Sequence, residues 1–295
     1  MTLPRQVLPG RFYLVTRRCT QRQFLLRPDA ATNNNFLYCL AVAAARCHLD
    51  VLLPCAMSNH YHAVVFDRHG TLPAFTQYFH RLLASSQNAL RGRGENLWDN
   101  AQVSNVRLVD RADVLAKLVY VATNPVKDGL VEKVHHWPGV NGLAELLADR
   151  EIVATRPTHY FRPDGPMPDT ATLRLTVPRE LGDAAQLRAE LRTLVADVEQ
   201  RLEEERRRAG RRVLGRRAVL QQDWRDAPTT PEPRRGLRPR VAARNAWARA
   251  EALLRNQAFI DDYRRARAAW LAGIRVDFPP GTYWLRRFAN VPIAA

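Results

Sequence analysis

Two histidines separated by a single residue are the part of this sequence best suited to hold a metal ion. His60 and His62 lie in residues 57–66, where a polar turn precedes β-branched and aromatic residues, a composition typical of a β-strand. Because side chains on a strand alternate between its faces, both imidazoles should point one way and Tyr61 the other. Paired histidines also occur as ordinary hydrogen-bonded residues, so the motif needs a second element.

A helix further along the chain supplies candidate partners for the two histidines. Residues 111–123 carry apolar side chains at three- and four-residue steps, and Pro125 should end the helix near Asn124. Tyr120 and Asn124 are four residues apart and would share a helix face. An amide oxygen suits a hard divalent cation, and a phenol oxygen could act as a nucleophile. Taken alone, this pair fits a half-buried core aromatic and a polar helix end better.

The kind of metal follows from the ligand types. Nitrogen and oxygen ligands without a thiolate, as in His60, His62 and Asn124, favour Mg²⁺ or Mn²⁺. A zinc site made of Cys55, His60 and His62 is an alternative, but it lacks the paired spacing of structural zinc ligands.

Together the two elements resemble the single-tyrosine HUH transposases, and within them the REP-associated tyrosine transposases. The segments that carry the resemblance are Asn59-His60-Tyr61-His62, Tyr120-x-x-x-Asn124-Pro125-Val126 and the following Lys127-Asp128-Gly129-Leu130-Val131. Residues 10–18, which end in Val-Thr-Arg-Arg, are similar to the family's first strand. The likeness covers residues 8–140.

The resemblance implies a specific reaction. His60, His62 and Asn124 would hold a divalent metal, which polarises and orients a phosphodiester. Tyr120 would attack single-stranded DNA near a hairpin, forming a 5′-phosphotyrosine and a free 3′-OH. Because the covalent intermediate conserves the bond energy, rejoining would need no ATP.

The sequence also departs from this family in two places. Leu14 stands where many relatives have a histidine. Residues 94–100 read Gly-Glu-Asn-Leu-Trp-Asp-Asn, where many relatives carry a Gly-His-x-Phe-x-x-Arg-like segment that helps to bind DNA. The second departure changes the expected DNA contacts, but neither affects the metal and nucleophile positions.

The first 140 residues predict an α+β fold with a ferredoxin-like antiparallel sheet and helices on one face. We expect strands at residues 12–16, 51–56, 61–66 and 103–109, and helices at 31–47, 72–90 and 111–123. Thr32 or Asn33 should cap the first helix. This β-α-β-β-α-β-α order is typical of such a sandwich, and the resemblance implies the same core. The last helix would bring Tyr120 to the histidines on the sheet.

The remainder of the chain predicts two further parts. Residues 1–140 would form the nuclease domain, 141–180 a Pro-rich linker or wrapping segment, and 181–295 a mostly helical, Arg-rich accessory region. The candidate DNA-binding residues are Arg17, Arg18, Arg207, Arg208, Arg211, Arg212, Arg235 and Arg238. Arginine binds phosphate bidentately and stacks on bases, although a solvated basic surface would have the same composition.

The net charge indicates the kind of binding partner, and the cysteine pattern indicates the cellular compartment. The net charge of +16 and the pI of about 10.7 favour a polyanionic partner such as single-stranded DNA with hairpins. The four cysteines form no Cys-x-x-Cys pair, and the longest apolar run, residues 36–45, is too short to span a bilayer. We therefore expect a cytoplasmic protein with reduced thiols and no membrane association. The sequence does not choose between a monomer and a homodimer.

Three functions fit these observations. The first is a metal-dependent, transposase-like endonuclease and strand transferase, and the second is a non-catalytic, regulatory DNA-binding descendant of such an enzyme. The third is an unrelated metal-dependent hydrolase. The presence of both histidines together with Tyr120 and Asn124 favours the first over the second. The basic charge and the tyrosine favour the first over the third.

Overall fold

The structure is a computed structural model that describes residues 4–231 and 239–294. Its elements are, in chain order, β1 (Arg11–Arg18), η1 (Thr20–Arg22), α1 (Ala30–Cys47), β2 (Asp50–Ala56), β3 (His60–Asp67), α2 (Leu72–Arg91), β4 (Ser104–Leu108), α3 (Arg111–Ala122), α4 (Asn124–Lys127), η2 (Val134–His136), α5 (Leu143–Ala148), β5 (Glu151–Thr155), β6 (Thr170–Arg174), η3 (Arg179–Leu181), α6 (Ala184–Arg208), α7 (Arg216–Gln221), β7 (Val241–Ala242), α8 (Ala246–Leu271) and α9 (Trp284–Ala289).

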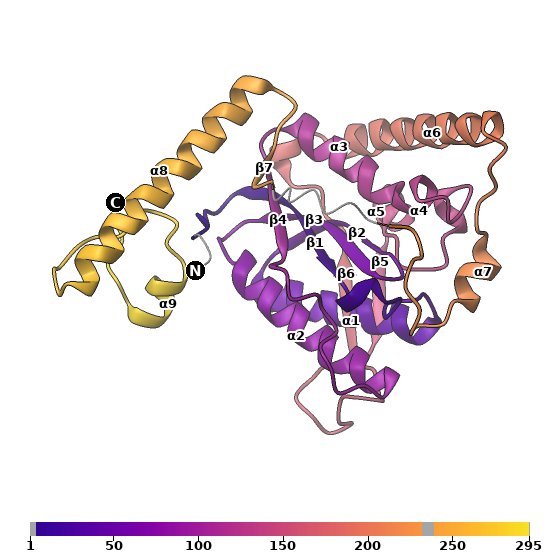
Figure 1. Ribbon diagram of the computed structural model, residues 1–295, viewed down its shortest axis with the longest axis horizontal. Coiled ribbons are helices and arrows are strands. Elements are labelled where there is room, and N and C mark those ends of the chain that lie inside the picture. Colours follow the sequence, from indigo (N-terminus) through magenta and orange to yellow (C-terminus); the bar gives the residue numbers. More distant parts are fainter. Residues whose placement is uncertain (1–3, 232–238, 295) are drawn as a thin grey trace.

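A central sheet with the strand order β2-β3-β1-β4-β7 organises the fold (Figure 1). β1 pairs antiparallel with both β3 and β4, and β2 pairs antiparallel with β3. The short β7 joins the edge of the sheet in parallel with β4. The first four strands and the helices between them have the ferredoxin-like arrangement that the sequence predicts, and all seven predicted elements of this part are present within a few residues.

The helices cover both faces of this sheet, and not one face as the sequence predicts. On one face, the Tyr61 ring lies 5.6 Å from Phe36 of α1 and 5.4 Å from Phe79 of α2, between ring centroids. On the other, Tyr120 of α3 lies 5.3 Å from His62. The reason is the composition of β2 and β3, which are buried along almost their whole length. Strands that are apolar on both faces need cover on both.

The start of α1 also differs from the predicted one. The helix begins at Ala30, and its N-cap is Asp29, not Thr32 or Asn33. The Asp29 carboxylate accepts a hydrogen bond from the Thr32 backbone N–H at 2.7 Å. An N-cap lies outside the helix and satisfies the first unpaired N–H groups. With Asp29 as its cap, the helix begins one residue before the predicted range.

Residues 141–180 are more regular than their proline content predicts. They contain α5 and the antiparallel pair of β5 and β6. Asn34 on α1 binds this pair, with its amide N–H donating to the Thr155 carbonyl at 2.8 Å. The Tyr38 hydroxyl also donates to the Pro168 carbonyl at 2.6 Å. The segment thus wraps around α1.

The C-terminal region is helical, as predicted, and its two halves differ in how they pack. α6 packs along α3 through Leu187, Leu191 and Val195, which are buried. The core that begins at Tyr13 therefore extends past the predicted boundaries to Val219. Further on, α8 and α9 protrude from one side of the molecule (Figure 1) around a small cluster of their own, formed by Ala266, Phe278 and Val291. No helix in the described ranges is both long and apolar enough to cross a membrane.

Candidate metal and nucleophile site

His60 and His62 lie next to each other on one face of β3, as the alternation of the strand predicts. Their ring centroids are 4.8 Å apart. His62 is buried and His60 is half-buried. The neighbouring β1 places Thr16 opposite His62 and Arg18 opposite His60. The pair therefore lies at the end of β3 that adjoins the turn from β2, with one ring more accessible than the other.

The hydrogen bond of His60 defines which of its nitrogens can bind a metal. Its Nδ1 lies 2.7 Å from Oδ1 of Asn59. The Asn59 amide N–H donates to the Arg22 carbonyl at 3.2 Å, which fixes the amide orientation. Because Oδ1 can only accept, Nδ1 of His60 carries the proton and the lone pair is on Nε2. This is the arrangement that orients a metal-binding imidazole.

His62 is held in the same way by a hydroxyl. Its Nδ1 is 2.7 Å from Oγ1 of Thr16. Burial lowers the pKa of His62 well below its usual value, and the charges of His60 and Lys117 act in the same direction. The ring is therefore neutral at neutral pH. Because the Thr16 hydroxyl can donate or accept, this contact orients the ring without fixing its tautomer. Nε2 offers its lone pair to a metal in the tautomer in which Nδ1 donates to Thr16.

Asn124 supplies the third candidate ligand. It is the first residue of α4, and Thr123 lies between it and the end of α3. Its side chain is buried, and its Oδ1 has no hydrogen-bond partner among the described residues. A buried carbonyl oxygen without a partner costs about 1–3 kcal/mol. A bound cation would remove this cost, and two imidazole nitrogens with an amide oxygen are a suitable ligand set for Mg²⁺ or Mn²⁺.

Tyr120 lies against the histidine pair. Its ring contacts His62, and the ammonium groups of Lys127 and Lys117 lie 4.8 Å and 5.3 Å from the ring centroid. Burial raises the pKa of Tyr120, and the Asp128 carboxylate raises it further, whereas the Asn124 amide lowers it. The free phenol is therefore protonated at neutral pH. Two lysines beside it would stabilise either a phenolate or a phosphate group.

The zinc alternative with Cys55 has no support in the geometry. Cys55 pairs with His62 across the β2–β3 ladder, but burial raises the pKa of its thiol and so disfavours the thiolate that zinc needs. Within the described ranges, no three His, Cys, Asp or Glu side chains gather closely enough to hold a metal. A third protein ligand beside the two histidines would therefore be a group of another type, for which Asn124 is the candidate.

The two arginines of β1 lie on opposite faces of the sheet. Arg18 pairs with His60 and so shares the histidine face, and its guanidinium is 3.9 Å from the Asp99 carboxylate. Arg17 pairs with Tyr61 on the other face and donates a 2.8 Å hydrogen bond to Nδ1 of His80. Only Arg18 is therefore close to the candidate site.

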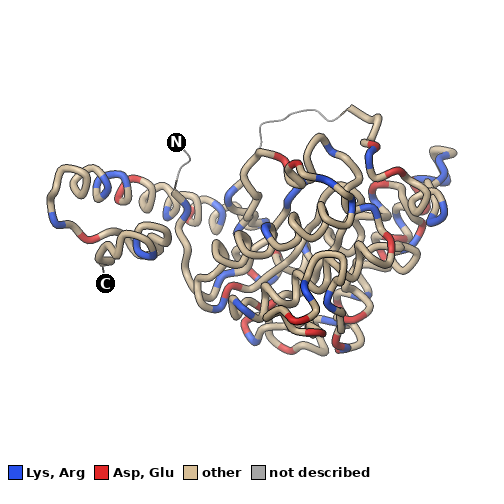
Figure 2. The backbone as a smooth tube through the Cα atoms, turned by 90° about the horizontal axis from the view of Figure 1, so that it is seen from below, with Lys and Arg blue, Asp and Glu red and all other residues tan. Residues whose placement is uncertain are grey.

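The arginines at the end of α6 and just after it lie near the helix pair that carries Tyr120 and Asn124. Arg207, Arg208, Arg211 and Arg212 are exposed. Just after them, the backbone N–H of Leu214 donates to the Gly129 carbonyl at 2.8 Å, which fixes this segment beside α4. Lysine and arginine are dense in this part of the molecule, at the right of Figure 2. Arg235 and Arg238 lie outside the described residues.

Sequence reasoning missed the residues that orient the site. Thr16 and Asn59 fix the imidazoles, and Lys117, Lys127 and Asp128 set the charge around Tyr120. The conspicuous signal was that Lys127 and Asp128 directly follow the Asn-Pro-Val motif, and Asn59 directly precedes the histidines. Thr16 could be found only through the strand register.

Comparison with known proteins gave a structural likeness but no sequence match. No family model matches the chain, and no curated protein sequence matches it. Among solved structures, a REP-associated tyrosine transposase bound to a REP hairpin is similar to this chain, with 16% sequence identity and a TM-score of 0.43. The alignment covers 50% of this chain and 86% of that one.

Proposed function

We propose that this protein is a metal-dependent, transposase-like enzyme that cleaves and rejoins single-stranded DNA near hairpins through a covalent phosphotyrosine. The observation that carries the proposal is the unpartnered, buried Oδ1 of Asn124 beside Tyr120, with the oriented imidazoles of His60 and His62 on the facing strand. These groups come from segments far apart in the chain.

In this proposal, His60, His62 and Asn124 hold a Mg²⁺ or Mn²⁺ ion, which supplies Lewis-acid polarisation of the phosphodiester when bound. The Tyr120 oxygen attacks the phosphorus and forms a new P–O bond, while the bond to the 3′ oxygen breaks. The phenol proton is lost and the 3′ oxygen gains one, which leaves a 3′-OH. Attack of a 3′-OH on the phosphotyrosine reverses these changes and rejoins the strand.

The surrounding charges support a phosphate in this position. Lys117, Lys127 and Arg18 lie around the site, and the exposed arginines at and after the end of α6 lie beside α4. A single strand could follow these cations into the site. A cytoplasmic DNA-processing protein, as a monomer or a homodimer, is consistent with this arrangement.

One observation favours the alternative, a DNA-binding descendant that no longer cleaves. The pKa of Tyr120 is raised, and a phenol that stays protonated is a poor nucleophile. In a catalytic protein, the bound metal or the two lysines must offset this effect. The two functions differ in whether a covalent adduct forms.

The decisive experiment is an adduct assay with hairpin-bearing single-stranded DNA and Mn²⁺. Label at the 3′ end should migrate with the protein on a denaturing gel, and label at the 5′ end should appear in a shorter, free fragment. Tyr120→Phe should lose the adduct by at least about a thousandfold while it binds DNA almost normally. Tyr78→Phe, on α2, is the matched control and should keep it. An adduct that persists in Tyr120→Phe, or DNA binding by the wild type without any adduct, would disprove the enzymatic proposal.

A further inference from the structure

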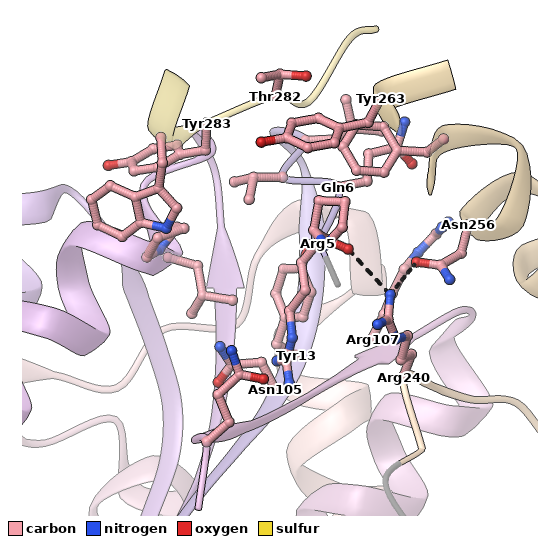
Figure 3. A pocket seen from close by; sticks show the side chains of 18 of the residues that line it. Arg5, Gln6, Tyr13, Asn105, Arg107, Arg240, Asn256, Tyr263, Thr282 and Tyr283 are labelled. Carbon is pink, nitrogen blue, oxygen red and sulfur yellow. Dashed lines mark hydrogen bonds between the residues drawn. The ribbon is translucent and has the colours of Figure 1, made fainter. Parts of the chain in front are cut away.

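A second cavity lies on the face of the sheet that is opposite the histidines. Its volume is about 830 Å³. Its walls come from the segment before β1, the strands β1 and β4, the first half of α2, and the C-terminal region from Arg240 through α8 to the start of α9. Figure 3 shows Tyr13, Asn105 and Arg107 of the sheet facing Tyr263 and Tyr283 of the C-terminal region. This volume is ample for a nucleotide-sized ligand.

The lining of the cavity is strongly cationic. Seven arginines contribute to it, and no aspartate or glutamate lines it in the part of the chain that the structure describes. Arg5 and Arg107 are partly buried, and the pKa of each is lowered by burial and by a neighbouring arginine, Arg240 for Arg5 and Arg11 for Arg107. The nearest acids act from outside the lining, as Asp67 does on Tyr13 and Glu251 on Arg107. Among the lining arginines, Arg264 pairs with the Asp261 carboxylate at 3.8 Å. The fold therefore gathers more cations here than the nearby acids neutralise.

Several polar groups of the cavity also have no hydrogen-bond partner. Of the buried side-chain nitrogen and oxygen atoms without a partner among the described residues, five belong to residues of this lining: Arg5 Nη1, Arg11 Nε, Arg17 Nε, Arg107 Nε and Asn105 Oδ1. Buried polar groups are normally paired. Unpaired buried Nε atoms also occur away from this cavity, at Arg27, Arg91 and Arg93. The excess of arginines in the lining is therefore the stronger indication of an anionic ligand, and guanidinium groups match phosphate best.

Aromatic and amide groups make up the rest of the wall. Tyr263, Tyr283 and Phe259 lie on the C-terminal side, and Asn105 offers an unpaired acceptor on the opposite side (Figure 3). Aromatic rings stack on bases, and an amide oxygen can accept from an exocyclic amino group. Arg240 is held in place by its hydrogen bonds to the Pro4 carbonyl at 3.2 Å and to Asn256 Oδ1 at 3.5 Å.

We infer that this cavity binds a nucleoside phosphate, either as a free nucleotide or as one nucleotide of a DNA strand. The phosphate lies between Arg5, Arg11 and Arg107, and the base lies toward Tyr263. Since the ligand joins the sheet to α8, it also fixes the C-terminal helices to the core. The inference does not depend on the chemistry proposed for Tyr120, because the two sites lie on opposite faces of the sheet.

The test is calorimetric titration of the full chain with ATP, with adenosine and with a 5′-phosphorylated tetra-deoxyadenylate. Arg107→Gln and Arg11→Gln should each weaken binding of the phosphorylated probe at least tenfold. The matched control, Arg192→Gln, removes the same charge from an exposed position on α6 and should change binding less than twofold. Adenosine should bind much more weakly than ATP.

The outcomes separate the two sources of the ligand and the two sites. Saturable binding of ATP identifies a free nucleotide, whereas binding of the oligonucleotide alone identifies a DNA strand. If neither binds saturably, or if Arg107→Gln and Arg192→Gln weaken binding equally, the inference is wrong. An adduct at Tyr120 would then leave the proposed function intact. Conversely, Tyr120→Phe should bind the nucleotide normally.

Thermal melting tests whether these arginines have a purely structural role. Without ligand, Arg107→Gln should melt at the same temperature as Arg192→Gln or above it, because the substitution relieves repulsion from Arg11. If Arg107 only supported the fold, the Arg107→Gln variant would have a lower melting temperature than Arg192→Gln. A lower melting temperature for Arg107→Gln, together with unchanged nucleotide binding by Arg11→Gln, would also overturn the inference.

Discussion

The two faces of the central sheet both carry buried polar groups without partners, but these groups are of opposite kinds. On the α3 face the unpaired atom is an acceptor, Oδ1 of Asn124, beside two imidazole rings. On the α2 face the unpaired atoms are mostly arginine donors, such as those of Arg5 and Arg107. An unpaired acceptor can coordinate a cation, and unpaired donors can bind an anion, so that each group gains the partner that buried polar groups normally have. One sheet can thus offer a cation-binding site on one face and an anion-binding site on the other.

The histidines illustrate the same contrast. His80 on α2 is fully enclosed, and both of its nitrogens are used, because Nδ1 accepts from Arg17 at 2.8 Å and Nε2 lies 2.5 Å from the Tyr61 hydroxyl. Since Arg17 can only donate, Nε2 carries the proton and donates to Tyr61. In His62, Nδ1 lies beside the Thr16 hydroxyl, and Nε2 has no hydrogen-bond partner among the described residues. A histidine with both nitrogens occupied supports the fold, whereas one with a single oriented nitrogen can bind a ligand.

The test with the largest expected effect compares the two kinds of histidine by the yield of the covalent adduct. His60→Ala should reduce Mn²⁺-dependent adduct formation by at least about a thousandfold, because it removes a metal ligand. His80→Gln should lose stability and yet keep most of the activity per folded molecule. Adduct yield and a melting curve measured on the same samples distinguish the two effects. Activity that survives His60→Ala would exclude the metal role.

The second test concerns the stabilisation by metal. Mn²⁺ at one hundred times its dissociation constant should stabilise the folded state by about 2.7 kcal/mol, and EDTA should reverse this. For a chain of this size the melting temperature should rise by about 5 °C or more. Asn124→Ala should melt near the wild-type temperature in EDTA, since it removes an unpaired oxygen, but should lose most of the Mn²⁺ shift. An equal shift in both proteins would show that Asn124 is no ligand.

The third test uses pH and has the smallest expected effect. Burial and the Arg17 charge lower the pKa of His80 well below its usual value, so the folded state keeps this ring neutral. The unfolded chain takes up a proton below about pH 6.5. Stability should therefore fall as the pH decreases below that value, by up to about 1.4 kcal/mol per pH unit for this group. His80→Gln should be less stable at pH 8 and show a shallower acid slope. Parallel pH profiles would contradict this account.

The local parts of the site could be predicted from the sequence because they depend on short-range periodicity. The alternation of residues along β3 was sufficient to put His60 and His62 on one face with Tyr61 on the other. The apolar stripe and Pro125 placed Tyr120 near the end of α3. Where several local options compete, as at the N-cap of α1, the sequence favoured Thr32 or Asn33 over the correct Asp29.

Long-range packing decided everything that depends on which segments meet. No periodicity indicates that α3 lies on the face opposite α1 and α2, because an apolar stripe does not specify its partner. The register of β1 against β3 made Thr16 the partner of His62, and the burial of Asn124 left its oxygen unpaired. The cavity between Arg5, Arg107 and Tyr263 joins residues from both ends of the chain. The sequence by itself thus determined which chemical groups are available, and the tertiary structure decided which of them face one another, since contacts between distant segments depend on the packing of the whole core.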